Sequence, residues 1–157
     1  MGESGMAEHR RNLVSEVRQL LAHLCHRPHL VVRITVLLAW THALMLSLHL
    51  AGRAAPAILP VHGLSQPVAL VDDWWWVSVH GAAAVILIVA ALRPAHLVGI
   101  CGASLSAAAW AVWSALDLAW SVDTRPPASL VAPMLGLLVC TPLALLTAAA
   151  WSEHDLT

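Results

Sequence analysis

Four long apolar stretches, separated by short polar breaks, fill most of this chain. They cover approximately residues 30–51, 74–92, 95–118 and 130–151. A helix needs about 20 predominantly apolar residues to cross the hydrocarbon core of a bilayer, and each stretch is long enough. Lipid offers the backbone no hydrogen-bond partners, so runs of this kind are restricted to helix. The sequence therefore predicts an all-α integral membrane protein built as a bundle of four transmembrane helices.

The composition fits a chain that is almost entirely membrane domain. Hydrophobic residues make up 59% of it and charged residues 11%, whereas soluble domains carry about 25% charged residues. The membrane domain, residues 30–151, takes up most of the 157 residues and leaves no room for a separate catalytic domain. The formal net charge of -1 provides no field for nucleic acid. We expect a non-enzymatic protein whose surroundings are the bilayer and other membrane proteins.

The arginines are distributed unequally between the predicted loops. One side would hold six, Arg10, Arg11, Arg18, Arg27, Arg33 and Arg93, and the other only Arg53 and Arg125. Short loops rich in arginine stay cytoplasmic, so both termini are predicted to lie inside. Trp74, Trp75 and Trp76 open the second span, where indole rings are expected at the headgroup level. Basic residues that are all arginine suggest a GC-rich bacterial or phage source, and hence the bacterial inner membrane.

Residues 1–29 form a leader ahead of the first span, and residues 152–157 form a short cytoplasmic tail. Within the leader, apolar residues recur at helical spacing, at Leu13, Val17, Leu20, Leu21 and Leu24. This pattern predicts an amphipathic helix that either lies on the cytoplasmic leaflet or packs on protein. Pro28 is expected to end it. His23, Cys25, His26 and His29 are residue types that bind zinc, but a break at Pro28 separates His29 from the others, and we predict no metal site.

Small residues recur along one side of the third span, at Gly99, Gly102, Ala103, Ser106 and Ala107. Such residues let helix backbones approach closely, which is how helices gain contact in lipid. We therefore expect this stripe to be a helix-packing surface. The fourth span contains Pro133 and Pro142, which are expected to bend it.

Ionisable residues inside spans are where function is expected first in a membrane protein. Here they are His42 and His49 in the first span, His80 in the second and Asp117 in the third. From the helical rise, His42 and His80 both lie within roughly 5 Å of the midplane. His49 and Asp117 both lie roughly 12 to 15 Å toward the outside.

Three interpretations of these residues remain open. His42 and His80 could be axial ligands of a haem b held between the first two spans. Alternatively, His49 and Asp117 could form the entrance, and His42 and His80 the relay, of a proton or ion path. In the third interpretation, each neutral histidine donates one hydrogen bond to a neighbouring helix and is structural. The third is favoured, because neutral histidine is far cheaper to bury than a charged group.

The leading functional hypothesis is a small non-enzymatic membrane protein that acts through helix association, as a homo-oligomer or an accessory subunit of a larger membrane complex. It would associate through the small-residue stripe of the third span. One alternative is a holin-like or channel-like pore former, possibly encoded by a phage. The other is a subunit that holds haem between two histidines or conducts protons.

Overall fold

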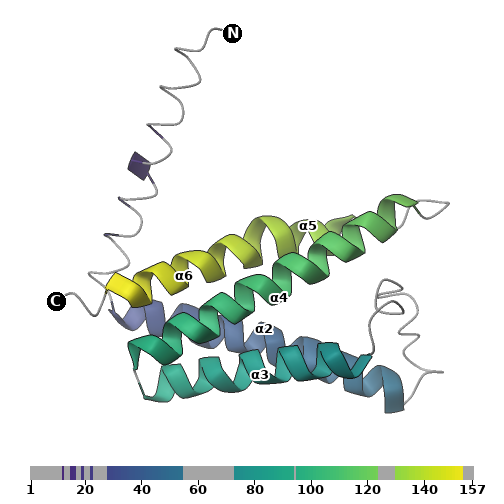
Figure 1. Cartoon of the computed structure of the whole chain (residues 1–157), viewed down its shortest axis with the longest axis horizontal. Helices are drawn as coiled ribbons and strands as arrows, with labels where there is room; N and C mark the ends of the chain where they lie inside the picture. Colours follow the sequence, from purple (N-terminus) through teal and green to yellow (C-terminus); the bar gives the residue numbers. More distant parts are fainter. Residues whose placement is uncertain are drawn as a thin grey trace, which may run out of the picture.

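The structure is a computed structural model that describes residues 12, 15, 16, 19, 22, 28–54, 73–93, 95–123 and 130–153. The amphipathic pattern of the leader therefore lies largely outside the described residues, as do His23, Cys25 and His26 and most of the tail. The helices are α2 (Pro28–Ala54), α3 (Asp73–Leu92), α4 (His96–Asp123), α5 (Val131–Leu135), the π-helical turn η3 (Gly136–Cys140) and α6 (Thr141–Glu153). Figure 1 shows their arrangement.

Four helical segments are long and apolar enough to cross a membrane: Pro28–Ala51, Trp74–Leu92, His96–Asp123 and Val131–Glu153. For the residues that the structure describes, the prediction of an all-helical fold with four helices long and apolar enough to span a membrane is confirmed. The boundaries differ most in the third span, because α4 continues to Asp123, five residues past its predicted end. The first span begins at Pro28, where the fixed φ of proline suits the first turn of a helix.

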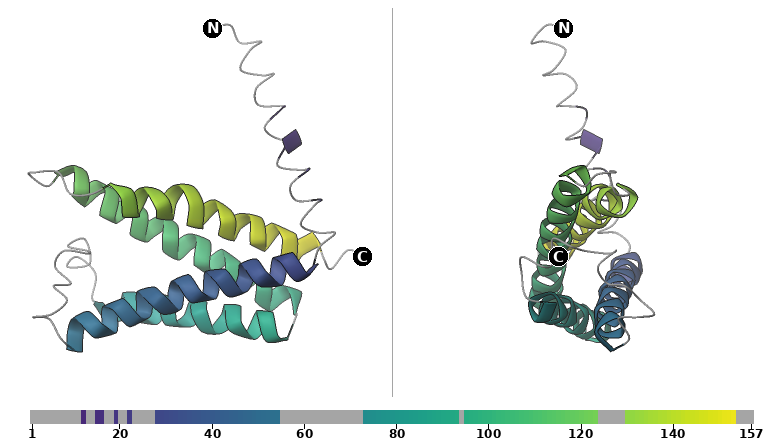
Figure 2. Two further views of the ribbon diagram at one scale, coloured as in Figure 1. Left: turned by 180° about the vertical axis from the view of Figure 1, so that it is seen from behind. Right: turned by 90° about the vertical axis from the view of Figure 1, so that its right-hand side faces the viewer.

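Each helix lies beside the next, α2 against α3, α3 against α4, and α4 against α6. The ends at Pro28, Leu92, His96 and Glu153 gather at one end of the bundle, which we call the base. Toward the other end, which we call the distal end, the pair α2 and α3 diverges from the pair formed by α4 with α5 and α6 (Figure 2).

The core is layered from the base upward. At the base, Val31 packs with Ala150 and Trp151, and the Trp151 indole donates a hydrogen bond of 3.1 Å to Thr35 Oγ1. The next layer holds Leu38 and Leu87 among small side chains: Ala39, Ala103, Ala107, Ala144 and Ala148. A third cluster contains Trp76, Trp110 and Trp113. Small side chains therefore fill the layers near the base, and large aromatic ones fill the layer beyond them.

The small-residue stripe of α4 lies inside this core. Gly99, Gly102, Ala103, Ser106 and Ala107 are all buried by the chain's own helices. A Cβ on Gly99 would collide with the Trp151 ring of α6, and one on Gly102 would lie 3.0 Å from Ile86 Cγ2 of α3. The stripe thus packs α4 against α3 and α6, and a surface for another chain has to lie elsewhere.

The fourth span contains a π-helical turn just before Pro142. A proline inside a helix clashes with the carbonyl four residues earlier and cannot donate to it. In η3 the Thr141 backbone N–H bonds instead to the Gly136 carbonyl, five residues back. Thr141 Oγ1 donates to the same oxygen at 2.9 Å. Pro133 lies in the first turn of α5. Backbone N–H groups in a first turn have no acceptor within the helix, so a proline there costs no helical hydrogen bond.

We predict that Gly99→Ala destabilises the bundle by about 1–3 kcal/mol, the usual cost of overpacking a tight contact. The indole of Trp151 would have to move, and its hydrogen bond to Thr35 would be strained. The measurement is the free energy of unfolding in a membrane mimetic. Gly81→Ala is the matched control, because a Cβ there meets only Leu46 Cδ2, at 3.9 Å. Equal stability of the two variants would contradict the close α4–α6 contact.

Candidate functional site

Three helices each contribute one fully buried polar side chain to a single cluster. His42 comes from the middle of α2, His80 from α3 and Ser106 from α4, and each has an exposed fraction of 0%. His42 lies one helical turn beyond Leu38, so the cluster sits directly on the apolar layer. We call His42, His80 and Ser106 the histidine cluster.

Two short hydrogen bonds join the histidine cluster. The Nδ1 atoms of His42 and His80 are 2.7 Å apart. His42 Nε2 lies 2.7 Å from Ser106 Oγ. His42 is thus bonded at both ring nitrogens and links α3 to α4 through α2.

The structure brings a third histidine close to the cluster but leaves Asp117 out of it. The His49 ring stacks on the His80 ring, with centroids 6.1 Å apart and planes at 27°. Asp117 is buried on α4. Its carboxylate makes no hydrogen bond or ion pair with any residue in the parts of the chain that the structure describes.

Two tryptophans pack against the histidines, and a third packs against one of these tryptophans. The Trp110 ring centroid lies 5.6 Å from that of His42 and 5.9 Å from that of His80. The Trp76 ring lies 6.2 Å from His80, and Trp113 meets Trp110 edge to face at 5.7 Å. Trp74, Trp75 and Trp76 are all expected from the sequence at the headgroup level, yet among the three only Trp76 is buried. The helical spacing of Ser106, Trp110, Trp113 and Asp117 was the available signal for this face of α4.

The hydrogen-bond network assigns the proton positions in the neutral cluster. His80 Nε2 is buried, and no hydrogen-bond acceptor or donor for it lies in the described part of the chain. The His80 ring packs against the rings of His49, Trp76 and Trp110, and the π face of an aromatic ring attracts an N–H but repels a lone pair. We therefore assign the hydrogen of His80 to Nε2, so that its Nδ1 accepts from the His42 Nδ1–H. His42 Nε2 in turn accepts from the Ser106 hydroxyl, so the donors run in one direction from α4 to α3.

This arrangement does not fit a haem held by His42 and His80. Two nitrogens on opposite sides of one metal ion are roughly 4 Å apart, twice a metal–nitrogen bond of about 2 Å. The Nδ1 atoms are 2.7 Å apart and the ring centroids 4.9 Å apart, which leaves no space for a porphyrin. Among the described residues, no group of three or more metal-binding side chains is arranged to hold an ion.

The packing below the histidine cluster is apolar. Leu38, Leu87 and Ala103 are each at most 1% exposed and close the interior toward the base. Thr35 and Thr147 lie nearer the base, and both hydroxyls donate to carbonyls of their own helices. Within the described bundle, polar side chains therefore do not continue from the histidines to the base, as a path through one copy would require.

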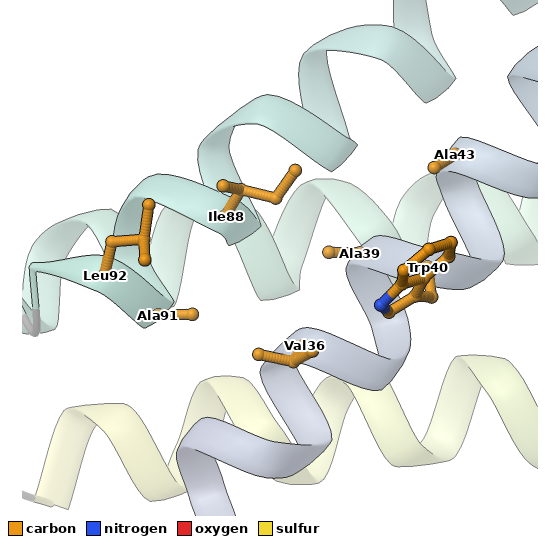
Figure 3. A pocket seen from close by; sticks show the side chains of 7 residues that line it. All are labelled: Val36, Ala39, Trp40, Ala43, Ile88, Ala91 and Leu92. Atoms are coloured by element: carbon orange, nitrogen blue, oxygen red, sulfur yellow. The ribbon is translucent and has the colours of Figure 1, made fainter.

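A second feature lies on the outside of the bundle, between α2 and α3. Here an apolar groove of about 320 Å³ is lined from α2 by Ala39, Trp40 and Ala43, and from α3 by Ile88 and Ala91 (Figure 3). The alanines form its floor, because they have little side chain to fill the space between the helices. Trp40 stands at its edge and is 70% exposed.

We predict that His42 and His80 are energetically coupled. His42→Phe keeps a ring of similar size but leaves His80 Nδ1 and Ser106 Oγ buried without their partner, which costs about 1–3 kcal/mol of unfolding free energy. The double variant His42→Phe/His80→Phe should cost less than the sum of the two single changes. Unfolding free energies of all four proteins measure this coupling. Ser47→Ala is the control, because this exposed hydroxyl bonds only to the Ala43 carbonyl of its own helix. Strict additivity would contradict the His42–His80 bond.

No protein-family model, curated protein or solved structure matches this chain. What the protein does has to be inferred from its own geometry, above all from the buried histidine cluster and from the groove beside the exposed Trp40.

Proposed function

We propose that this chain is a small non-enzymatic multi-pass membrane protein that acts by associating with a second copy of itself through the groove between α2 and α3. The observation that carries the proposal is the position of Trp40. It lies 12 residues after the first residue of α2 and 14 before the last, at the middle of a spanning helix. Its side chain is nevertheless 70% exposed on the outer surface.

An exposed indole is poorly placed at this depth. Tryptophan is enriched at the two membrane interfaces, where its ring is in apolar surroundings and its N–H reaches water or headgroups. At the middle of the hydrocarbon core, lipid provides no acceptor for that N–H. A protein neighbour supports this placement better than lipid does, because a second helix supplies both packing area and polar atoms.

The surface around Trp40 is self-complementary. A large exposed ring stands beside a groove with an alanine floor, so two copies related by a two-fold axis can each insert Trp40 into the other's groove. Such an interface uses the same patch on both subunits, as closed dimers do. Ala39 and Ala43, four residues apart on α2, are the small residues that allow close helix contact.

We predict that Trp40→Ala weakens self-association in lipid vesicles by tenfold or more, since truncating a central interface tryptophan typically costs about 2 kcal/mol. Energy transfer between fluorescently labelled copies, measured as the vesicles are diluted with lipid, gives the dissociation constant. Trp75→Ala is the matched control, because that residue is 60% exposed but lies at the start of α3, at the distal end.

Two results would contradict the proposal. One is a wild-type protein that stays monomeric at every protein-to-lipid ratio, in which case the groove holds lipid chains. The other is association that Trp75→Ala weakens as much as Trp40→Ala does. Crosslinking in native membranes could also recover only a complex with a different protein. The occupant of the groove would then be that protein and not a second copy of this chain.

We further propose that the chain lies in a bacterial inner membrane with both termini in the cytoplasm. The distribution of arginine in the sequence supports this orientation: six arginines lie before or near the start of the first span or directly after the second, against two in the other loops. A green fluorescent protein fused after Thr157 should fluoresce, and alkaline phosphatase fused at the same position should be inactive. The reverse pair of results would show that the base faces the periplasm.

A further inference from the structure

We propose that the histidine cluster is a binding site for a single proton, which His42 takes up at Nε2 while Ser106 reverses from hydrogen-bond donor to acceptor. The proposal goes beyond self-association and does not depend on it. It rests on three features of the site. These are the two short hydrogen bonds of His42, the aromatic rings beside it, and the short Nδ1–Nδ1 distance, which leaves room for only one hydrogen between the two rings.

His42 can bind one additional proton without losing either of its hydrogen bonds. In the cationic form both nitrogens of His42 are donors. Its Nδ1–H still donates to His80 Nδ1 across 2.7 Å. Its new Nε2–H donates to Ser106 Oγ, also across 2.7 Å, because a hydroxyl oxygen accepts as readily as it donates. Both bonds become charge-assisted and hence stronger.

One indole ring lies within the distance range of a cation–π contact with His42. The Trp110 centroid lies 5.6 Å from the His42 centroid, with the ring planes at 42°. Tryptophan is the best of the aromatic side chains at holding a cation within about 6 Å of its ring. The centroid of the same ring lies 5.9 Å from that of His80, so the indole is close to both members of the pair.

A second proton would break the site. His80 could take it only at Nδ1, which already accepts from His42. Two N–H groups would then face each other across the 2.7 Å between the Nδ1 atoms, and the two rings would have to separate. The site thus has a capacity of one proton.

The other titratable groups nearby are few. Among the described residues, α2 contributes His49, stacked on His80, α4 contributes Asp117, and η3 contributes Cys140, which packs against the tryptophan cluster. The nearest charged residue on α6 is Glu153, exposed at the base. A cation on His42 would therefore depend on its two hydrogen bonds and on Trp110 rather than on a paired carboxylate.

Magnetic resonance of the full chain in lipid nanodiscs, with isotope-labelled histidine, tests the proposal. A nitrogen–nitrogen coupling across the His42–His80 hydrogen bond is expected at high pH, with signals assigned by their loss in His42→Gln. On titration from about pH 8 to about pH 3, His42 should become doubly protonated while the coupling persists. His80 should not protonate until the coupling disappears.

The Ser106→Ala variant distinguishes a role of the hydroxyl in proton binding from a role in packing alone. Without the hydroxyl, His42 should bind its proton about tenfold less tightly, a shift of about one pH unit to lower pH. Ser106→Thr keeps the hydroxyl and should restore the wild-type titration, while Ser47→Ala should leave it unchanged. The proposal is overturned if His42 stays neutral throughout the titration, if the coupling is absent, or if Ser106→Ala titrates like wild type. Energy transfer in the same nanodisc samples reports self-association separately.

Discussion

The bundle depends on how closely α4 approaches its neighbours near the base. Gly99 admits the Trp151 ring, and Gly102 admits side chains of α3, so one helix holds both sides of the fold together. In lipid this close contact replaces the hydrophobic effect, which contributes little between apolar helices. Because α4 is fixed there, the rest of its inward face, from Ser106 onward, is aimed between the helix pairs. The position of the histidine cluster follows from that packing.

The sizes of the core side chains then determine the shape. Alanines and glycines near the base bring all four spans together, whereas Trp76, Trp110 and Trp113 fill a wider space beyond the histidines. The helix pairs diverge where the side chains become large (Figure 2). The same rings that separate the pairs also enclose His42 and His80. The shape of the bundle and the surroundings of the histidines thus depend on the same core side chains.

Much of this organisation could be predicted from the sequence, and most of the missing parts concern which side of a helix faces protein. Apolar length gave the four spans, and the helical rise placed His42 and His80 at the same depth, where the structure joins them. Hydropathy does not tell which side of a uniformly apolar helix faces protein. The roles of Ser106 and Trp76, the outward position of Trp40, and the inward position of the small-residue stripe therefore required the packed helices. A proline in a helix predicts a bend, but it does not predict that the bend takes the form of a π-helical turn before Pro142.

The divergence of the helix pairs also has a consequence for the membrane itself. The described helices lie close together at the base and farther apart toward the distal end. In a bilayer these helices would therefore occupy a smaller cross-section in the leaflet at the base than in the opposite leaflet. The tryptophan cluster lies on the side of the histidines where that cross-section is larger.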